Sequence, residues 1–473
     1  MSHALDNPVK SVTVVGGGVA GMSAACALAE AGFAVQLVER RGYLGGRASS
    51  YRHPGVNEVI DNCQHVLFGC CTNLIGFYRR IGVADKIHWT NNMTMIEPSG
   101  RRSRLGPSRP ALPAPLHGAL SLLSAKAFNF ADKVALGRAF RAMMRPGALD
   151  YSRESLGDWL RRHKQTEGAM NRFWRLVIAS ALNADIEDIA VPYAAKVIRE
   201  LFMNSAQAGS MGMSAAPLSD LYASAEKFLI EHRARIVYNA NVEGAVWNEE
   251  SARWTIRTRI GELTSDYIVL ALPFEAMGTL LPHMPAAEGA AELIWKVEQH
   301  QHWPICSVHL WFDREITELE HAVLLDREIH WMYNKSRLQP WRELHGSYVE
   351  LVVSASREFA ALSREDAIAQ SLSELAEFFP TVREAKLVKA ALVKEVRATF
   401  GVPPGIDAAR PEVVSPWPHL YLAGDWIDTG WPSTMESAAR AGHLAAEALG
   451  VQAENQLRCF EPDLKPKGFM RFV

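Results

Sequence analysis

The residues most able to do chemistry lie near the start of the chain. Three glycines follow the β-branched run 11–15 in the order Gly16-x-Gly18-x-x-Gly21, and Glu39 comes 18 positions after the last of them. In such a pattern Gly16 allows a tight turn, Gly18 lets the backbone approach a pyrophosphate, and Gly21 lets a helix pack on the strand. Glu39 stands where a carboxylate accepts hydrogen bonds from a ribose. The spacing therefore predicts a dinucleotide site.

The elements that must position these groups are a buried parallel strand, an Ala-rich helix over 22–31 and a second strand over 34–38. Phosphates would lie against the N-terminus of that helix, where free N–H groups favour anions. The uncharged stretch between Lys10 and Glu30 is interpreted as this strand, turn and helix. It is not interpreted as a signal peptide or a membrane span, because it contains a glycine cluster and lacks a cleavage site.

Composition narrows the class of protein. A chain of 473 residues exceeds the size of one hydrophobic core, so we expect two domains. A net charge of −2 gives no reason to expect nucleic acid binding. The six cysteines follow no metal-ligand spacing, so we expect reduced thiols in a cytoplasmic protein and no metal site.

A second glycine cluster identifies the dinucleotide. Gly45-Gly46-Arg47, shortly after Glu39, resembles the second flavin-contact motif of the amine oxidase and phytoene desaturase superfamily. In that superfamily the Arg neutralises the pyrophosphate of FAD. The resemblance implies FAD as cofactor and an α/β fold, in which a Rossmann-type FAD-binding domain carries an inserted α+β substrate domain.

Later segments resemble the rest of the flavin site. The strand over 420–422 ends at Gly424-Asp425, and ligands of α/β sheets bind at such carboxyl ends. In the superfamily this Asp contacts the ribityl and phosphate portion of FAD; the structural alternative is an Asp that caps the following helix. The full set of expected FAD contacts is Gly16, Gly18, Gly21, Glu39, Gly45, Gly46, Arg47, Val242, Gly424, Asp425, Thr434 and Met435.

The three parts of this site are far apart in the sequence, so the domains are expected to be discontinuous. The FAD-binding domain is assigned to residues 1–95, 215–275 and 395–450, the substrate domain to 96–214 and 276–394, and a C-terminal tail to 451–473. Within the substrate domain we expect helices near 101–205 and a sheet near 280–390.

A finer resemblance concerns the reaction. The segments 61–67, 308–313 and 397–442 are similar to the hydroxysqualene dehydroxylase family, the squalene-associated FAD-dependent desaturases of bacterial hopanoid pathways. The resemblance implies that reduced flavin delivers hydride to an allylic carbon of hydroxysqualene as its hydroxyl leaves, forming squalene. Cys63 departs from the family, which usually has Gly there. No second dinucleotide fingerprint occurs, so the electron donor remains unknown.

Gln64 and His65 are the leading catalytic candidates, because the stretch after Asp61 faces the flavin in this superfamily; a buried structural His is the alternative. Trp331, Trp431 and His309 could line the pocket or simply pack in the core. Amine oxidases of the superfamily place a Lys near the flavin on a strand of the inserted domain. The absence of Lys between residues 303 and 312 argues against amine oxidation.

The segment 101–145 is basic and amphipathic, with nine Lys or Arg against one acid, Asp132, which we interpret as a helix N-cap. One helix face would carry Arg138, Arg141 and Arg145, and the other Leu136, Phe140 and Met143. This pattern is typical of a helix in a membrane interface, so we expect a cytoplasmic protein peripheral to the inner face of the membrane. The alternative is a helix that caps the domain with a solvated basic face.

Two rival functions stay open. The same fold could desaturate a carotenoid or phytoene-type polyene. It could also serve as a non-catalytic prenyl-binding escort, because GDP-dissociation inhibitors share it without using flavin. Gly45-Gly46-Arg47 and Gly424-Asp425 argue against the escort. A colourless purified protein would favour it.

Overall fold

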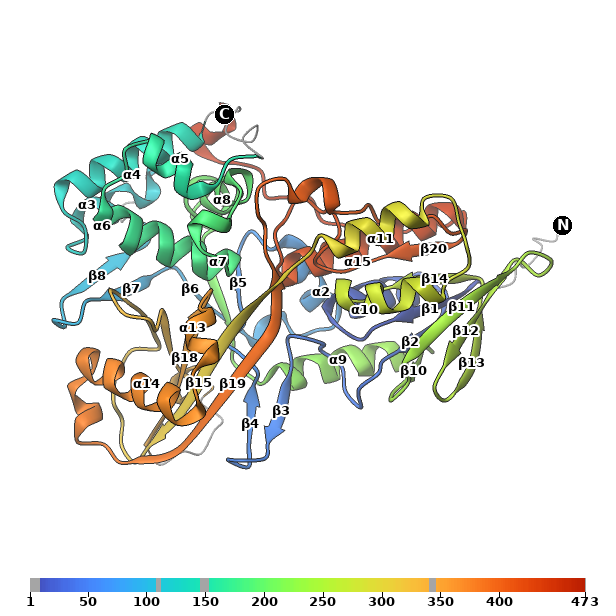
Figure 1. The fold of residues 1–473 in the computed structure, drawn as a ribbon, viewed down its shortest axis with the longest axis horizontal. Coiled ribbons are helices and arrows are strands. Elements are labelled where there is room, and N and C mark those ends of the chain that lie inside the picture. The colour runs from blue at the N-terminus through green and yellow to red at the C-terminus, as the bar shows by residue number, and fades with distance from the viewer. Residues whose placement is uncertain (1–8, 108–111, 145–152, 340–345, 473) are drawn as a thin grey trace.

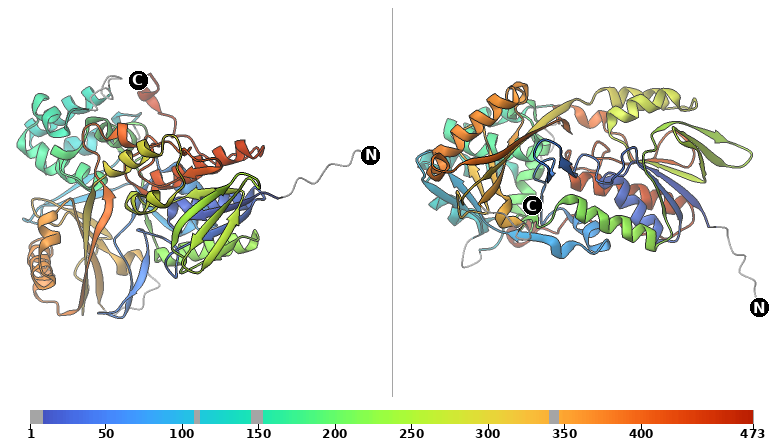
Figure 2. Two further views of the ribbon diagram at one scale, coloured as in Figure 1. Left: turned by 45° about the vertical axis from the view of Figure 1, so that its right-hand side comes forward. Right: turned by 90° about the horizontal axis from the view of Figure 1, so that it is seen from below.

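The computed structural model describes residues 9–107, 112–144, 153–339 and 346–472, and two large sheets organise it (Figure 1). One has five strands in the order β10-β2-β1-β14-β20, and the other has seven in the order β19-β15-β18-β17-β16-β7-β8. A group of helices packs on one end of the seven-stranded sheet, and the five-stranded sheet lies to its side (Figure 2).

The five-stranded sheet is entirely parallel. Its strands are β1 (Ser11–Val15), β2 (Ala34–Val38), β10 (Arg235–Val237), β14 (Tyr267–Leu270) and β20 (Leu420–Leu422). The helices around it are α1 (Val19–Glu30), α2 (Thr72–Arg80), α9 (Leu218–Glu231), α10 (Phe274–Leu280), α11 (Ala290–Glu298) and α15 (Met435–Gln452). Gly442 lets α15 approach α1 closely, because a Cβ there would lie 2.3 Å from the Ala20 carbonyl oxygen. These contacts place the starts of α1 and α15 at one edge of the sheet.

Three smaller sheets accompany it. They are β3 (Ser50–His53) with β4 (Glu58–Asp61); β5 (Val66–Phe68), β9 (Met211–Ser214) and β6 (Ile87–Thr90); and β11 (Val242–Asn248), β12 (Arg253–Thr258) and β13 (Gly261–Ser265). The β3–β4 hairpin ends at Asp61, so it positions the loop that carries Gln64 and His65.

The strands of the seven-stranded sheet are β7 (Met93–Ile96), β8 (Arg102–Leu105), β15 (His302–Phe312), β16 (His321–Leu324), β17 (Trp331–Asn334), β18 (Ser347–Ser354) and β19 (Leu387–Phe400). β7 and β8 correct the expectation of helices from residue 101 onward and of a sheet confined to 280–390. Arg102 and Arg104 point outward on alternate positions of β8, so the basic residues there belong to a strand. β7 begins inside the range assigned to the FAD-binding domain, and β19 crosses the predicted boundary at 394/395.

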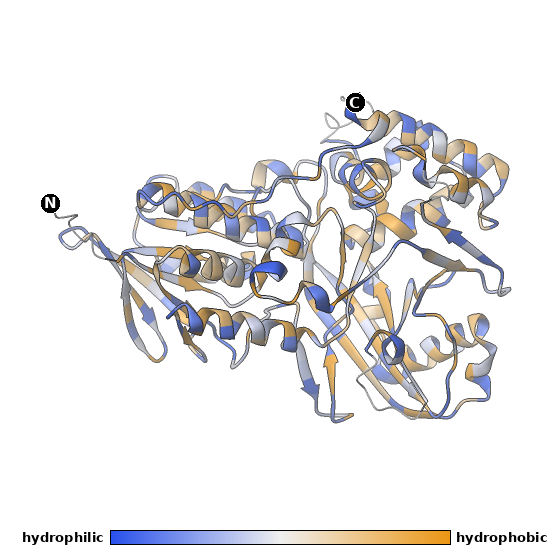
Figure 3. Ribbon diagram, turned by 180° about the vertical axis from the view of Figure 1, so that it is seen from behind, coloured by the Kyte–Doolittle hydropathy of each residue, from blue (hydrophilic) through white to orange (hydrophobic). Residues whose placement is uncertain are grey.

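The two faces of this sheet have different neighbours. One packs under α13 (Arg357–Ala361) and α14 (Arg364–Phe378), with Val308, Leu310 and Leu351 in that core. Alternate residues of the same strands, such as Ile305 and Val352, point to the opposite face, toward the five-stranded sheet. Strands in the centre of the molecule are largely hydrophobic, whereas the outer helices show mixed hydropathy (Figure 3).

The group of helices at one end of the seven-stranded sheet is called the helical cap below. It consists of α3 (Ala119–Ser124), α4 (Phe130–Met143), α5 (Leu156–Arg162), α6 (Glu167–Ala169), η4 (Met170–Ile178), α7 (Ala179–Leu182), α8 (Val191–Ile198) and η6 (Arg199–Met203), of which η4 and η6 are π-helical. The N-cap of α4 is Asn129, and Asp132 is the third helical residue of a capping box, which corrects the predicted N-cap. Arg145 lies outside the described residues.

The predicted lipid-facing side of α4 is wrong. Leu136 and Met143 are buried in the protein core, and the Phe140 ring packs edge-on against Phe173 at 5.4 Å and Trp174 at 6.0 Å. Helical periodicity identified residues that share a face, but that face meets protein. The exposed large apolar residues of α4 are Phe130, at its start, and Val134.

The segment 451–473 also differs from a simple tail. Asp463 accepts a hydrogen bond from Lys196 at 2.6 Å, and the Phe469 amide donates to the Ala114 carbonyl at 2.8 Å. The C-terminus therefore lies beside the helical cap (Figure 1).

Candidate functional site

A cavity of about 880 Å³ runs between the two sheets, and nearly all the residues predicted to contact FAD line it. The lining members are Gly16, Gly18, Glu39, Gly45, Gly46, Arg47, Val242, Gly424, Asp425, Thr434 and Met435. Gly21 does not line it and is buried in α1.

Glycine is needed at each position of the fingerprint for a different physical reason. Gly16 has φ +108°, and a Cβ there would lie 2.3 Å from the Ala271 carbonyl oxygen. A Cβ at Gly21 would lie 1.8 Å from the Gly16 carbonyl oxygen, so its role is packing of helix on turn. Gly18 is different, because a Cβ there would meet only the Gly46 Cα, at 3.9 Å. The fold itself does not require glycine at 18, whereas close approach of a dinucleotide phosphate to the helix start does. The residues present therefore fit the cofactor.

Glu39 is fixed at the end of β2. Its two carboxylate oxygens accept from the backbone amides of Gly17 at 2.7 Å and Arg41 at 2.8 Å. Glu39 is buried yet lines the cavity, with lone pairs remaining for further donors. This arrangement suits a carboxylate that receives ribose hydroxyl groups.

Arg47 and Asp425 pair across the cavity. Burial opposes ionisation of Asp425, but the Arg47 guanidinium beside it holds the pKa of that carboxyl below its ordinary value. Ser433 also donates to Asp425, at 2.5 Å. The N-cap of α15 is Thr434, so the alternative in which Asp425 caps this helix does not hold.

The sequence analysis missed Arg410, which shapes the loop after β20. Its guanidinium donates to the backbone carbonyls of Asp425, Trp426 and Ile427 at 3.2, 3.3 and 2.5 Å. An Arg between Ala409 and Pro411 has no local signal for this role, because the carbonyls it serves lie 15 to 17 residues further along.

Gln64 and His65, the predicted catalytic residues, both line the cavity. His65 Nε2 is 3.0 Å from Asn62 Oδ1, and burial lowers the pKa of His65 to about 4. His65 is therefore neutral at pH 7 and is a poor proton donor there. Gln64 Oε1 accepts from the Lys335 ammonium at 2.8 Å, and Gln64 Nε2 donates to the His65 carbonyl at 3.4 Å.

Two groups of ionisable side chains near the cavity, one of three residues and one of two, were not predicted. Lys335 lies between Asp61, at 2.8 Å, and Glu350, at 3.4 Å, and all three are buried. Glu200 lines the cavity, and burial raises its pKa although Lys196 Nζ is only 3.3 Å away. Lys196 and Glu200 are four residues apart along consecutive helical turns, so helical spacing could have indicated that pair. Asp61, Lys335 and Glu350 come from distant parts of the chain, and no spacing rule connects them.

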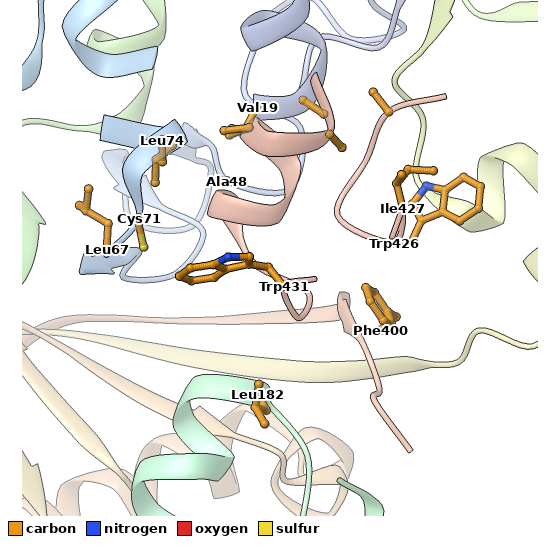
Figure 4. Packing of buried hydrophobic residues seen from close by; sticks show 14 of the residues in the cluster. Val19, Ala48, Leu67, Cys71, Leu74, Leu182, Phe400, Trp426, Ile427 and Trp431 are labelled. Atoms are coloured by element: carbon orange, nitrogen blue, oxygen red, sulfur yellow. The ribbon is translucent and has the colours of Figure 1, made fainter. Parts of the chain in front are cut away.

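The remaining walls are largely apolar. Trp331 and Trp431 line the cavity, and the Trp331 ring N–H donates to Ser180 at 2.9 Å. The Trp431 ring extends toward Cys71 and Leu67 (Figure 4). His309 does not line the cavity: it is fully buried, with ring nitrogens 3.1 Å from Ser307 Oγ and 2.8 Å from Tyr348 Oη. His309 therefore packs in the protein core and does not line the pocket.

Metal binding and thiol chemistry are the other kinds of chemistry that such a site could carry. Among the described residues, no group of three or more His, Cys, Asp or Glu side chains is placed to hold a metal ion. All six cysteines are free and buried, and burial raises the pKa of Cys63 well above its ordinary value, so this cavity-lining thiol is protonated.

Comparison with known proteins gives a family match along most of the chain. The family described as "Flavin containing amine oxidoreductase" matches residues 19–450. A 15-cis-phytoene desaturase of Synechococcus elongatus is 25% identical over 458 residues, covering 93% of this chain and 95% of the relative. A probable zeta-carotene desaturase of the same organism is 24% identical over 478 residues, covering 93% and 98%.

Solved structures with the same fold are more distant in sequence. A putrescine oxidase bound to putrescine has a TM-score of 0.71 at 17% identity, covering 93% of this chain and 99% of its own. Cyclohexylamine oxidase of Brevibacterium oxydans has a TM-score of 0.66 at 17% identity, covering 95% and 100%. These likenesses support the predicted α/β fold, with its FAD-binding and substrate parts.

Proposed function

The chain belongs to the flavin containing amine oxidoreductase family, and we propose that this FAD-dependent oxidoreductase desaturates a long-chain isoprenoid polyene. The observation that carries the proposal is the likeness to phytoene and zeta-carotene desaturases along 93% of the chain. These relatives favour desaturation over the reductive dehydroxylation of hydroxysqualene that the finer resemblance implies. The escort alternative is dropped, because the family and the cavity fit an FAD-dependent enzyme.

The cavity walls suit a hydrocarbon chain. Leu176, Val177, Val352, Trp331 and Trp431 contribute apolar surface, which holds such a chain and excludes water from the reacting carbons. Bound FAD supplies the hydride chemistry. Arg47 and the open backbone at Gly18 would hold its phosphates, and Glu39 its adenosine ribose.

A second candidate, reductive dehydroxylation of hydroxysqualene, is favoured by one specific observation. The Gln64 amide nitrogen makes only a long hydrogen bond of 3.4 Å, to the His65 carbonyl, because Lys335 occupies the amide oxygen. Gln64 can therefore donate to an acceptor in the cavity. A hydroxyl group offers such an acceptor, whereas a pure hydrocarbon offers none.

One anaerobic experiment separates the two reactions. Oxidised enzyme is incubated with phytoene or zeta-carotene, and chemically reduced enzyme is incubated with hydroxysqualene in deuterated water. Desaturation is supported when the polyene gains a double bond while flavin absorbance bleaches. Dehydroxylation is supported by squalene that carries one deuterium. If neither lipid changes, both candidates are wrong.

A variant sharpens the comparison. Gln64→Leu should lower kcat/KM for hydroxysqualene by about ten- to a hundredfold, because a buried hydroxyl would lose its donor. The same variant should leave polyene desaturation within about twofold of wild type. Gln299→Leu, at an exposed position on the surface, is the matched control. Equal effects of Gln64→Leu on both substrates would remove Gln64 from hydroxyl recognition.

We further propose that the protein docks on a membrane surface, through a different patch from the one predicted. The helical cap, the turn before it and the C-terminal segment beside them carry exposed apolar residues: Leu116, Leu120, Leu123, Phe130, Val134, Phe469 and Phe472. Lys126, Arg138 and Arg141 are exposed in the same segment. Such a mixture of apolar and basic side chains suits the interface of an anionic bilayer.

The substrate gives a reason for docking. At ~0.8 kcal/mol per CH₂, a chain of roughly thirty carbons costs on the order of 20 kcal/mol to move from lipid into water. Direct transfer from bilayer to cavity avoids this cost. No helix in the described part of the chain is both long and apolar enough to span a bilayer.

A further inference from the structure

Three buried charged groups meet behind the wall of the cavity. The Lys335 ammonium, only 1% exposed, is 2.8 Å from Asp61 Oδ2 and 3.4 Å from Glu350 Oε2. Their side chains are 5% and 0% exposed, so little water reaches any of the three. One ammonium is shared between two carboxyl groups, and full ionisation would leave a net negative charge in the interior. Burial makes such a charge costly, so one carboxyl should bind a proton more readily than an ordinary carboxyl does.

The two carboxyl groups have unequal support. Asp61 also accepts from Ser50 Oγ at 2.6 Å and from the Leu218 amide at 3.1 Å. Burial opposes ionisation of Asp61, but Lys335 and these donors lower its pKa to about 2. Neither oxygen of Glu350 makes a hydrogen bond of regular geometry; its nearest donors are Lys335 and the Gln64 backbone amide. Burial raises the pKa of Glu350 to about 7.

Several other titratable groups of the described residues lie close to Glu350. Besides Lys335 and Asp61, the titratable groups that face Glu350 are Cys63, in the loop after β4, Tyr333 on β17 and His309 on β15. Burial raises the pKa of the Cys63 thiol and of the Tyr333 hydroxyl well above their ordinary values, so both are neutral. Glu350 is therefore the member of the cluster whose charge can change.

The charged groups of this cluster lie close enough to the cavity to interact electrostatically with groups that line it. Lys335 donates to Gln64, which lines the cavity. Burial, and after it the nearby Glu350 carboxyl, raises the pKa of Cys63, which also lines the cavity. Only one side chain thus separates Glu350 and Lys335 from the space that holds the cofactor. Charges at such short range interact strongly in a poorly solvated interior.

We propose that Glu350 and Lys335 form a proton store behind the cavity wall, in which the Glu350 carboxylate takes up a proton when negative charge arrives in the cavity. Two-electron reduction of a flavin with uptake of one proton adds one negative charge. A proton moving from solvent to the Glu350 carboxylate neutralises that addition, and it returns to solvent on reoxidation. Lys335 remains charged throughout, because Asp61 stays ionised.

The proposal is tested on FAD-loaded protein without any isoprenoid, so its outcome does not depend on the proposed substrate. Proton uptake is measured while an electrode reduces the protein in weakly buffered solution between pH 6 and 8. Wild type should take up about 1.5 protons or more per two electrons near pH 7.5. Glu350→Gln should take up about one throughout. Glu374→Gln, a buried carboxyl on α14 that does not line the cavity, should behave as wild type.

A measurement on wild type alone guards against misfolding of the variant. The infrared difference spectrum between reduced and oxidised protein should gain the carbonyl band of one protonated carboxyl group near pH 7.5. Uptake of one proton at every pH in wild type, unchanged uptake in Glu350→Gln, or absence of that band would overturn the proposal.

Discussion

Replacing Gly18 with Ala should separate cofactor binding from folding. Gly18 is the N-cap of α1 with φ −75° and ψ −180°, a conformation that alanine adopts without strain. The added Cβ would have one neighbour within 4 Å, the Gly46 Cα at 3.9 Å, which is ordinary van der Waals contact. The FAD-free protein should therefore unfold within about 0.5 kcal/mol of wild type.

The cost should appear when FAD binds. The new methyl group would occupy the side of the helix start where a pyrophosphate must approach the backbone. Loss of one or two charge-assisted hydrogen bonds, each about 1.5–3 kcal/mol, corresponds to at least a tenfold loss of FAD affinity. Gly21→Ala makes the opposite prediction, because its Cβ would lie 1.8 Å from the Gly16 carbonyl oxygen and the fold itself should suffer.

The assay pairs thermal unfolding of the FAD-free proteins with FAD titration by calorimetry. Gly137→Ala is the matched control, since Gly137 lies within α4, its Cβ would meet nothing within 4 Å and it is remote from the cavity lining. Wild-type FAD affinity in Gly18→Ala would refute the assignment of this glycine to phosphate approach. A large loss of stability without FAD would show that Gly18 serves packing instead.

Three further outcomes are expected. Glu39→Ala should weaken FAD binding about ten- to a hundredfold in a titration, through loss of a charge-assisted bond worth about 1.5–3 kcal/mol, and unchanged affinity would remove Glu39 from the site. Phe130→Ser with Leu123→Ser should reduce co-sedimentation with anionic vesicles while flavin absorbance is retained, and added salt should weaken wild-type binding; indifference to both changes would contradict docking. Because the pKa of Asp61 falls from an ordinary 3.8 to about 2, its contribution to the free energy of unfolding is present above pH 3.8 and lost as pH falls toward 2. Lys335→Met should abolish that step in a chemical denaturation series and cost roughly 3–5 kcal/mol at pH 7.

The nucleotide-binding part of the fold was predictable because its requirements are local. Glycine alone readily adopts the positive φ of Gly16, and glycine alone fits against the turn as Gly21 does. Both residues follow the first strand closely in the sequence. The loop after β20, which carries Asp425, likewise contains a glycine with positive φ, Gly424 at +148°. Such signals survive in a single sequence because they do not depend on distant partners.

The helix α4 shows where local pattern is insufficient. Its period was correct, since Leu136 and Met143 do share a buried face. The pattern could not say what covers that face, because Phe173 and Trp174 come from another helix more than thirty residues later. The apolar stripe of α4 is buried against protein, so it cannot face lipid. The docking surface proposed instead depends on residues such as Phe130, which lie outside that stripe.

Lys335 bears on the amine oxidation question in a way that the sequence could not reveal. Lys is absent along β15, but Lys335 begins the short helix α12 (Lys335–Leu338) directly after β17, which lies two strands away from β15. Asp61, which binds its ammonium, is 274 residues distant in the sequence, and a polar stretch such as Asn334-Lys335-Ser336 gives no sign of burial. The ammonium is held by Asp61, Gln64 and Glu350 and does not line the cavity. Its geometry assigns it to the electrostatics of the cavity wall, and the expectation that amines are not substrates stays a prediction.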